Sequence, residues 1–249
     1  QRGHNLALLR LMVQALRTKG MLPGESFNLD FHAIPHFGEQ SILETHYVPR
    51  RSHAEKSVLT FLAQDNDSRV ICCANARLLK RDKADQVLRF VDFWKSTTGE
   101  LPKELVFDAQ LTTPRNLYAL EEMGIRFLTL RRRSAAIVRA LMALPAAAWT
   151  RCHLDVPHRK YRTPRIHESR VRLKDYPADL RQIAAIDLGR DQPTLLITND
   201  ARSRPERLLT RYAQRMIVEN AIADGVHFFH LDALSSDIQI EADLSVTLT

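Results

Sequence analysis

The sequence predicts an α/β protein built on a mixed β-sheet that helices flank. Alternating and short apolar segments, which are typical of strands, come first and then alternate with segments whose apolar residues recur at helical spacing. The 249 residues are 45% hydrophobic and 26% charged, as in globular chains. The 8 glycines form neither a Walker loop nor a dinucleotide-binding loop, which disfavours a nucleotide-binding enzyme.

The first half of the chain contains predicted strands followed by helix–strand units. After a helix over 5–18, residues 27–34 alternate between apolar and polar side chains, as in a half-buried strand. From residue 84 the apolar period becomes helical. The further predicted elements are a hairpin of strands over 57–64 and 68–79, strands over 40–48, 104–110 and 125–130, and helices over 84–99 and 113–123.

The second half is less regular and ends on a long helix. Within the less clear stretch 134–190, a helix is predicted over 134–144, and a basic, proline-containing region with small strands follows over 151–176. A strand over 194–200 precedes the last predicted helix, which begins near Pro205 and runs to Asp224.

The order of these elements predicts an RNase H-like fold. Three opening strands and two helix–strand units suit a mixed sheet in which the first and fourth strands are neighbours. We therefore expect a core formed by residues 1–133 and 193–249, with an insertion at 134–192 between the fifth strand and the last helix. The chain begins with Gln1 rather than Met, and we expect it to be a piece of a longer protein.

The charge of the chain favours a polyanionic partner. Lys and Arg number 36 against 29 Asp and Glu, which gives a net charge of +7 and a pI near 9.6. Nucleic acid is the favoured partner, and ordinary solubility is the alternative explanation. Three cysteines, an absent signal peptide and no apolar stretch long enough for a membrane predict a cytoplasmic protein without a membrane partner.

Two carboxylates stand on predicted strands. Asp30 lies on the polar face of the strand over 27–34, and Asp108 closes the apolar run over 105–107. The end of a central strand faces the crevice where α/β sheets bind ligands. The alternatives are an exposed strand position for Asp30 and, with equal weight, a cap of the following turn for Asp108.

A third carboxylate lies on the last predicted helix. At about 100° per residue, Glu219 falls in the middle of an apolar stripe formed by Leu209, Tyr212, Met216, Ala223 and Val226. A carboxylate on such a stripe is costly unless it is paired or bound to a metal. An ion pair with Arg215, four residues earlier, is the alternative.

The three acids together predict a metal centre. If the first and fourth strands are neighbours and the last helix packs over them, Asp30, Asp108 and Glu219 converge. Three carboxylates close together need cations between them, and such oxygen ligands suit Mg²⁺, with Mn²⁺ able to substitute. Two ions about 4 Å apart would support in-line displacement at a phosphodiester.

These residues resemble a known family. The spacing Tyr212-x2-Arg215-x3-Glu219 is similar to the signature of one group of DDE transposases from bacterial insertion sequences. The segments FNLDFHAIPHFGE and ELVFDAQLTT resemble the blocks around that family's first and second Asp. Several such blocks occur in the family's order over nearly the whole chain.

The resemblance implies a metal-dependent DNA transposase. Asp30, Asp108 and Glu219 would bind the catalytic metals, while Tyr212 and Arg215 would contact DNA phosphates near the cleavage point. Water would attack the phosphodiester at a transposon end, and the released 3′-hydroxyl would then attack target DNA. The partners would be double-stranded transposon ends and target DNA, bound by a homodimer. A bacterial cytoplasmic protein that associates with the nucleoid when it is on DNA is expected.

Further basic and polar residues are candidate DNA contacts. Arg131, Arg132 and Arg133 follow the strand over 125–130, and guanidinium groups pair well with phosphates. A solvated loop is the alternative for at least one of them. Asn199 ends the strand before the last helix, where orientation of a phosphate and capping of the next turn are equal possibilities.

A DNA-binding protein without catalysis is the alternative function. The family's Lys seven residues after the Glu is replaced by Val226, and the family's N-terminal DNA-binding region and usual C-terminal segment are missing. A domesticated or inactive remnant would keep the basic charge. A structure-specific nuclease on the same core is a third, weaker possibility.

Overall fold

The computed structural model describes residues 2–35, 43–48, 52–156 and 160–215. The chain divides into two compact units, and among the described residues the first ends at Pro102 and the second begins at Lys103. Glu219 lies outside the described residues. The predicted insertion over 134–192 stays a prediction. The division into compact units does not test where an insertion interrupts the core.

A sheet centred on one long strand forms the first unit. The strand β3 pairs antiparallel with three others, and its pairing with β4 confirms the predicted hairpin. All four strands match predicted segments, although the predicted order counted three opening strands, and β2 pairs only with the beginning of β3. The four strands are β1 (Ser26–Pro35), β2 (Glu44–Val48), β3 (His53–Asp65) and β4 (Ile71–Leu78).

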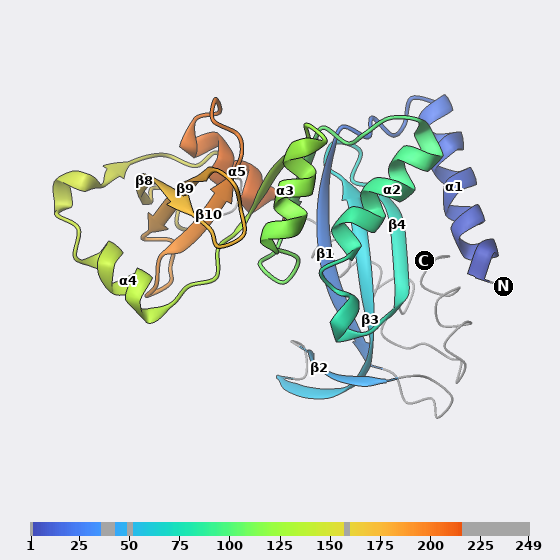
Figure 1. Ribbon diagram of the computed structural model, residues 1–249, viewed down its shortest axis with the longest axis horizontal. Coiled ribbons are helices and arrows are strands. Elements are labelled where there is room, and N and C mark those ends of the chain that lie inside the picture. The colour runs from blue at the N-terminus through green and yellow to red at the C-terminus, as the bar shows by residue number, and fades with distance from the viewer. Residues whose placement is uncertain (1, 36–42, 49–51, 157–159, 216–249) are drawn as a thin grey trace. The chain divides into compact units, whose positions relative to one another are not determined.

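Aromatic side chains pack one face of this sheet against a helix. The ring of Phe27 on β1 lies 5.0 Å from that of Phe90 and 4.6 Å from that of Trp94, both on α2 (Gln86–Thr98). The helix ends at Gly99, whose φ of 79° is unfavourable for other residues. The helix α1 (Arg2–Thr18) contacts α2 and β4 (Figure 1). The predicted helices over 5–18 and 84–99 are therefore confirmed.

The second unit contains a mixed sheet. The strands β5 and β6 are parallel, and every further pairing in the order β5-β6-β10-β9-β8-β7 is antiparallel. The strand β9 was not predicted, because four consecutive buried side chains from Gln182 to Ala185 show no alternation. The strands are β5 (Glu104–Phe107), β6 (Arg126–Leu130), β7 (Thr150–Arg151), β8 (Arg165–Arg172), β9 (Asp179–Ile186) and β10 (Thr194–Thr198).

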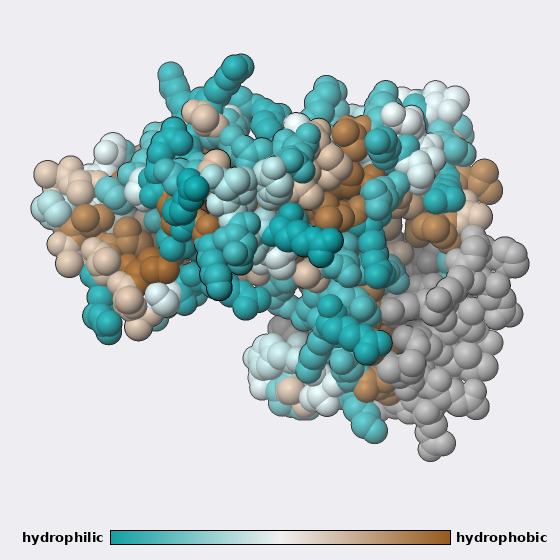
Figure 2. All heavy atoms as spheres, in the orientation of Figure 1, coloured by the Kyte–Doolittle hydropathy of each residue, from teal (hydrophilic) through white to brown (hydrophobic). Residues whose placement is uncertain are grey.

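Helices cover both faces of the strands β9 and β10. Neighbouring residues of a strand point to opposite faces. Ile183 and Leu196 pair and contact the α5 side, whereas Ala184 and Leu195 pair and contact the α4 side. Figure 2 shows hydrophobic atoms over α4, where Met142 is exposed. The helices of this unit are α3 (Pro114–Glu122), α4 (Ala135–Met142) and α5 (Pro205–Gln214).

The predicted class, α/β with a mixed sheet and flanking helices, is confirmed. The predicted neighbour relation of the first and fourth strands concerns strands of different units, and it stays a prediction. Between β6 and α5 lie α4 and the strands β7 to β9, within the range predicted for the insertion, followed by β10, which was predicted in the core. Within the described ranges no helix is both long and apolar enough to cross a membrane.

Candidate functional site

Asp30 lies in the middle of β1. It pairs with Leu62 of β3, it is half-buried, and its Oδ1 accepts a hydrogen bond of 2.9 Å from the N–H of Phe31. Three positions separate it from Phe27, so its side chain points to the face of the sheet opposite α2. Asp30 therefore lies on the face of the strand that was predicted to be polar.

Asp108 follows β5 directly. Its half-buried carboxylate accepts a hydrogen bond from the N–H of Ala109, and its carbonyl oxygen accepts bonds from the N–H of Leu111 at 3.0 Å and the hydroxyl of Thr112 at 3.3 Å. The carbonyl oxygen of Asp108 thus closes a tight turn at the carboxyl end of a parallel pair of strands. This turn and the predicted ligand position are compatible, because Oδ2 has no protein partner among the described residues.

The helix α5 is fixed to β5 by an ion pair. Nε of Arg211 lies 2.7 Å from Oε1 of Glu104, and both side chains are largely buried. Leu208 and Leu209 pack in the same cluster as Val106 of β5. The helix that was predicted to carry Glu219 is therefore held against the strand that ends at Asp108.

Tyr212 lies in the last turn of α5, and Arg215 is the C-cap residue of this helix. Tyr212 is half-buried and packs against the cluster that contains Val106. Arg215 is 7% exposed, and its guanidinium carbon lies 5.4 Å from the centre of the Tyr212 ring. Packing thus accounts for part of the role of Tyr212. The DNA contacts of both residues and the pairing of Arg215 with Glu219 stay predictions.

The three arginines after β6 differ in exposure and in hydrogen-bond partners. Arg131 is half-buried, its Nη1 donates to Oε1 of Gln182 at 2.7 Å, and burial lowers the pKa of its guanidinium. Arg132 is exposed. Arg133 is exposed and donates from Nη1 to the carbonyl oxygen of Pro193 at 3.4 Å. Their contacts with DNA stay predictions.

Asn199 joins β10 to the beginning of β6. Its Oδ1 accepts from the N–H of Phe127 at 2.9 Å, and its Nδ2 donates to the carbonyl oxygen of Ile125 at 3.1 Å. Both polar ends of the amide are thus used in a structural bridge. The proposed phosphate contact of Asn199 is untested, and this bridge is sufficient to explain the residue.

The fold of the chain is similar to that of a transposase. In a cryo-EM structure of the piggyBac transposase synaptic complex with hairpin DNA, the similar region covers 91% of this chain and 47% of that chain. The TM-score is 0.51 and the sequence identity is 12%, so the likeness concerns the fold alone. The chain thus spans about half the length of the transposase. No family model and no curated protein matches the sequence.

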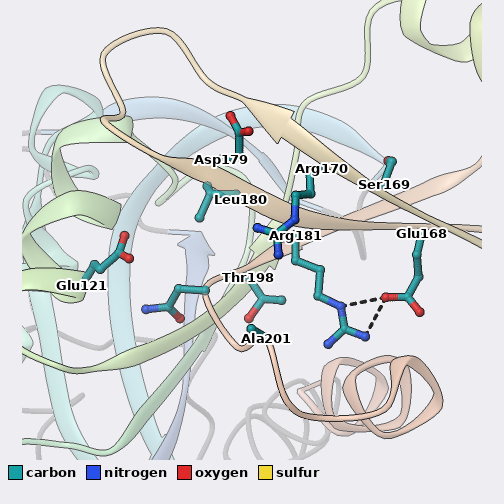
Figure 3. Close-up of a pocket in the computed structure, with 10 residues that line it drawn as sticks. Glu121, Glu168, Ser169, Arg170, Asp179, Leu180, Arg181, Thr198 and Ala201 are labelled. Atoms are coloured by element: carbon teal, nitrogen blue, oxygen red, sulfur yellow. Dashed lines mark hydrogen bonds and ion pairs between the residues drawn. The ribbon is translucent and has the colours of Figure 1, made fainter.

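Within the second unit, a cleft of about 530 Å³ lies among α3, β8, β9 and β10 (Figure 3). Arg181 points to Glu168, with 2.6 Å between Nη2 and Oε2, and donates to the carbonyl oxygens of Asp200 and Ser203. Asp108 does not line this cleft. Arg181, which pairs with Glu168, therefore supports the loop that leads into α5.

Asp200 fixes the same loop. Burial opposes ionisation of its carboxylate, but hydrogen bonds from Ser203 and the N–H of Arg202, with the charge of Arg126, outweigh burial and lower its pKa below the usual value. The loop is thus held by an ionised side chain. No sequence pattern indicated this role, because its partners include a residue on another element.

Positive charge is concentrated in the second unit. Residues 103–216 contain 22 Lys and Arg against 12 Asp and Glu, whereas the remaining residues contain 14 against 17. The second unit therefore has a net charge of +10 and the rest of the chain −3. A polyanion would be attracted to the second unit, which the average composition of the chain did not show.

Among the described residues no group of three or more His, Cys, Asp or Glu side chains forms a metal site. Glu219 is outside these residues, so the predicted triad stays a prediction. Carboxylates are the ligands that Mg²⁺ and Mn²⁺ prefer. Oδ2 of Asp108 has no protein partner in the described part of the chain, and the residue therefore fits the role of a metal ligand.

Proposed function

We propose that the chain is the catalytic region of a DNA transposase, with Asp30, Asp108 and Glu219 as metal ligands. The observation that supports this most is the position of Asp108 at the end of β5, the strand to which α5 is fixed, in a fold similar to that of piggyBac transposase. The positive charge of the second unit supports DNA as the substrate.

The Glu104–Arg211 ion pair supports the third ligand. The sequence predicts that the helix of α5 continues to Asp224. From Arg211 to Glu219 a helix advances about 12 Å, and from Glu104 to Asp108 a strand advances about 13 Å. The two advances are equal, so Glu219 would be level with Asp108 if the predicted helix ran along β5 beyond Gln214, where the described helix ends.

In the proposed reaction, a water oxygen forms a bond to phosphorus while the bond to the 3′ oxygen breaks. The 3′-hydroxyl that is released then attacks a phosphodiester of target DNA, where the bond from phosphorus to the target's 3′ oxygen breaks and that oxygen leaves as a hydroxyl. Bound Mg²⁺ or Mn²⁺ would supply charge stabilisation for the attacking and leaving oxygens. Asp30, Asp108 and Glu219 would hold that charge in place, and Tyr212 and Arg215 would position the DNA backbone.

Substitution of the three acids tests this proposal. In a cleavage assay on DNA that includes the sequences flanking the gene, Asp30→Asn, Asp108→Asn and Glu219→Gln should each abolish Mg²⁺-dependent strand cleavage and strand transfer. DNA binding should remain, because the substitutions remove negative charge. The exposed residues Asp92 and Asp191 provide matched controls, and their change to Asn should leave cleavage intact.

Each other outcome has a defined meaning. Cleavage by Asp108→Asn at the unchanged rate would remove Asp108 from the mechanism. DNA binding by the unchanged chain without any cleavage in Mg²⁺ or Mn²⁺ would identify a DNA-binding protein without catalysis. Cleavage without a strand-transfer product would identify a nuclease.

A further inference from the structure

Arg131 has a partly buried guanidinium that no acidic side chain in the described part of the chain neutralises. Among the described residues no carboxylate lies within ion-pair distance of its guanidinium, although the side chain is half-buried. Four arginines of this unit do pair with carboxylates, namely Arg165, Arg172, Arg181 and Arg211. A partly buried cation without a counter-ion is costly, so this position needs an explanation.

Gln182 holds Arg131 without neutralising it. Its side chain is 4% exposed, its Oε1 accepts from Nη1 of Arg131 at 2.7 Å, and its Nε2 donates to Oγ of Ser169 at 3.2 Å. Both ends of the amide are thus fixed, which defines its orientation. A carboxylate at this place would hold Arg131 as well but would cancel its charge. The neutral amide orients the guanidinium and leaves the charge for a ligand.

A chain of hydroxyl groups connects the turn of Asp108 to the end of β6. The hydroxyl of Thr112 donates to the carbonyl oxygen of Asp108 at 3.3 Å. It also lies 2.5 Å from the hydroxyl of Thr129, the residue two positions before Arg131. Thr129 is completely buried, so this connection is sheltered from water. Arg131 therefore leaves the sheet beside the turn that carries the proposed metal ligand.

We propose that Arg131 binds a DNA phosphate beside Asp108, and that Gln182 is the positioning residue that keeps its guanidinium oriented and uncompensated. This inference rests on the proposed function, because the phosphate belongs to the DNA that the enzyme would cleave. The two neighbouring arginines lack this arrangement. Arg132 is exposed, and Arg133 donates to a backbone carbonyl.

The change Gln182→Glu tests the inference. Glutamate has nearly the same shape, can still accept from Arg131, and gives that guanidinium the counter-ion that it lacks. The affinity for a fluorescently labelled DNA duplex of mixed sequence, measured by anisotropy without divalent cations, should fall about tenfold. The slope of log affinity against log salt concentration should fall by about 0.9, as for the loss of one phosphate contact.

Four further variants complete the experiment. Arg131→Ala should produce the same loss as Gln182→Glu, and the double variant should lose no more than either single one. Gln192→Glu, at an exposed position of the same unit, makes the same change of net charge and should leave the salt slope unchanged. If circular dichroism shows that Gln182→Glu does not fold, a comparison of Arg131→Ala with Arg131→Lys tests the phosphate contact. Lysine keeps the charge and should keep the salt slope.

The outcomes separate this inference from the proposed function. Salt-dependent binding by the unchanged chain that neither Arg131→Ala nor a folded Gln182→Glu alters would overturn the inference alone. A folded Gln182→Glu that loses affinity equally in the Arg131→Ala background would also overturn it, because the effect would not pass through Arg131. Absence of DNA binding by the unchanged chain would overturn both.

Discussion

At the scale of single residues, Gly24 shows how one missing side chain permits the core of the first unit. Its φ is 70°, and a Cβ atom at this position would lie 2.1 Å from Cζ2 of Trp94. Its N–H donates to Oδ1 of Asp65 at 3.0 Å. This position therefore requires glycine for two independent reasons, its positive φ and the contact that a Cβ atom would make with the fully buried Trp94.

We expect Gly24→Ala to destabilise the protein more than Gly20→Ala. Gly20 also has a positive φ, of 68°, but nothing lies within 4 Å of its missing Cβ. Gly20→Ala should therefore lower the free energy of unfolding by about 1–2 kcal/mol through the backbone alone. Gly24→Ala should add about 1–3 kcal/mol of overpacking. Denaturant titration measures both, and equal losses would contradict the role of Trp94.

Asp200 gives a pH-dependent prediction. Its pKa is lower in the folded chain than the ordinary value of 3.8, so ionised Asp200 stabilises the fold above that value. This contribution is lost as the pH falls through the folded pKa. Asp200→Asn should lower the free energy of unfolding by about 1–2 kcal/mol at neutral pH. The difference from the unchanged protein should shrink below pH 3.8, and denaturant titrations that show a constant difference would exclude this explanation.

At the scale of secondary structure, one ion pair fixes α5 to β5. The pair between Glu104 and Arg211 joins residues that are 107 positions apart, and side-chain exposures of 15% and 11% limit its contact with water. Removal of one partner of a buried pair leaves an uncompensated charge, which is more costly than removal of both.

We expect Glu104→Gln and Arg211→Met each to cost about 3 kcal/mol of stability, and the double variant to cost less than their sum. Both single variants should also slow the proposed cleavage, because α5 would no longer be fixed to the strand of Asp108. Denaturant titration and the cleavage assay measure these effects. The pair of Arg165 and Asp187 has the same 2.7 Å distance but is exposed, and its coupling should be smaller. Equal coupling in the two pairs would show that burial is unimportant.

At the scale of the whole molecule, the two units differ in charge. The second unit has a net charge of +10, and the rest of the chain has −3. Counter-ion release from DNA scales with the number of phosphates that a protein neutralises. DNA affinity should therefore depend on the charges of the second unit far more than on those of the first.

Two triple variants with equal changes of charge test this dependence. Replacement of Arg132, Arg139 and Arg190 by Gln should weaken binding to duplex DNA. The slope of log affinity against log salt concentration should fall by up to about 2.7. Replacement of the exposed residues Lys19, Lys80 and Lys95 of the first unit by Gln should leave the affinity and its salt dependence nearly unchanged. Anisotropy titrations over a range of salt concentrations measure both. Equal losses in the two triple variants would locate the DNA contact in both units.

The candidate site was predictable where local pattern was sufficient. Asp30 on a polar strand face and Asp108 at the end of a buried strand follow from alternation and from a short apolar run, and the structure has both features. The strand β9 and the role of Gln182 were missed. Four consecutive buried residues show no alternation, and an amide that contacts an arginine 51 positions away leaves no pattern in its sequence neighbours.

The sequence by itself determined the order of the elements, the positions of the two strand carboxylates and the excess of positive charge, because each depends on neighbouring residues or on composition. The tertiary structure decided which charges are neutralised, that the partly buried Arg131 pairs with an amide instead of an acid, and which strand α5 is fixed to. These depend on contacts between residues that are distant in the chain. Such contacts are set by packing and desolvation, and neither has a local signature in the sequence.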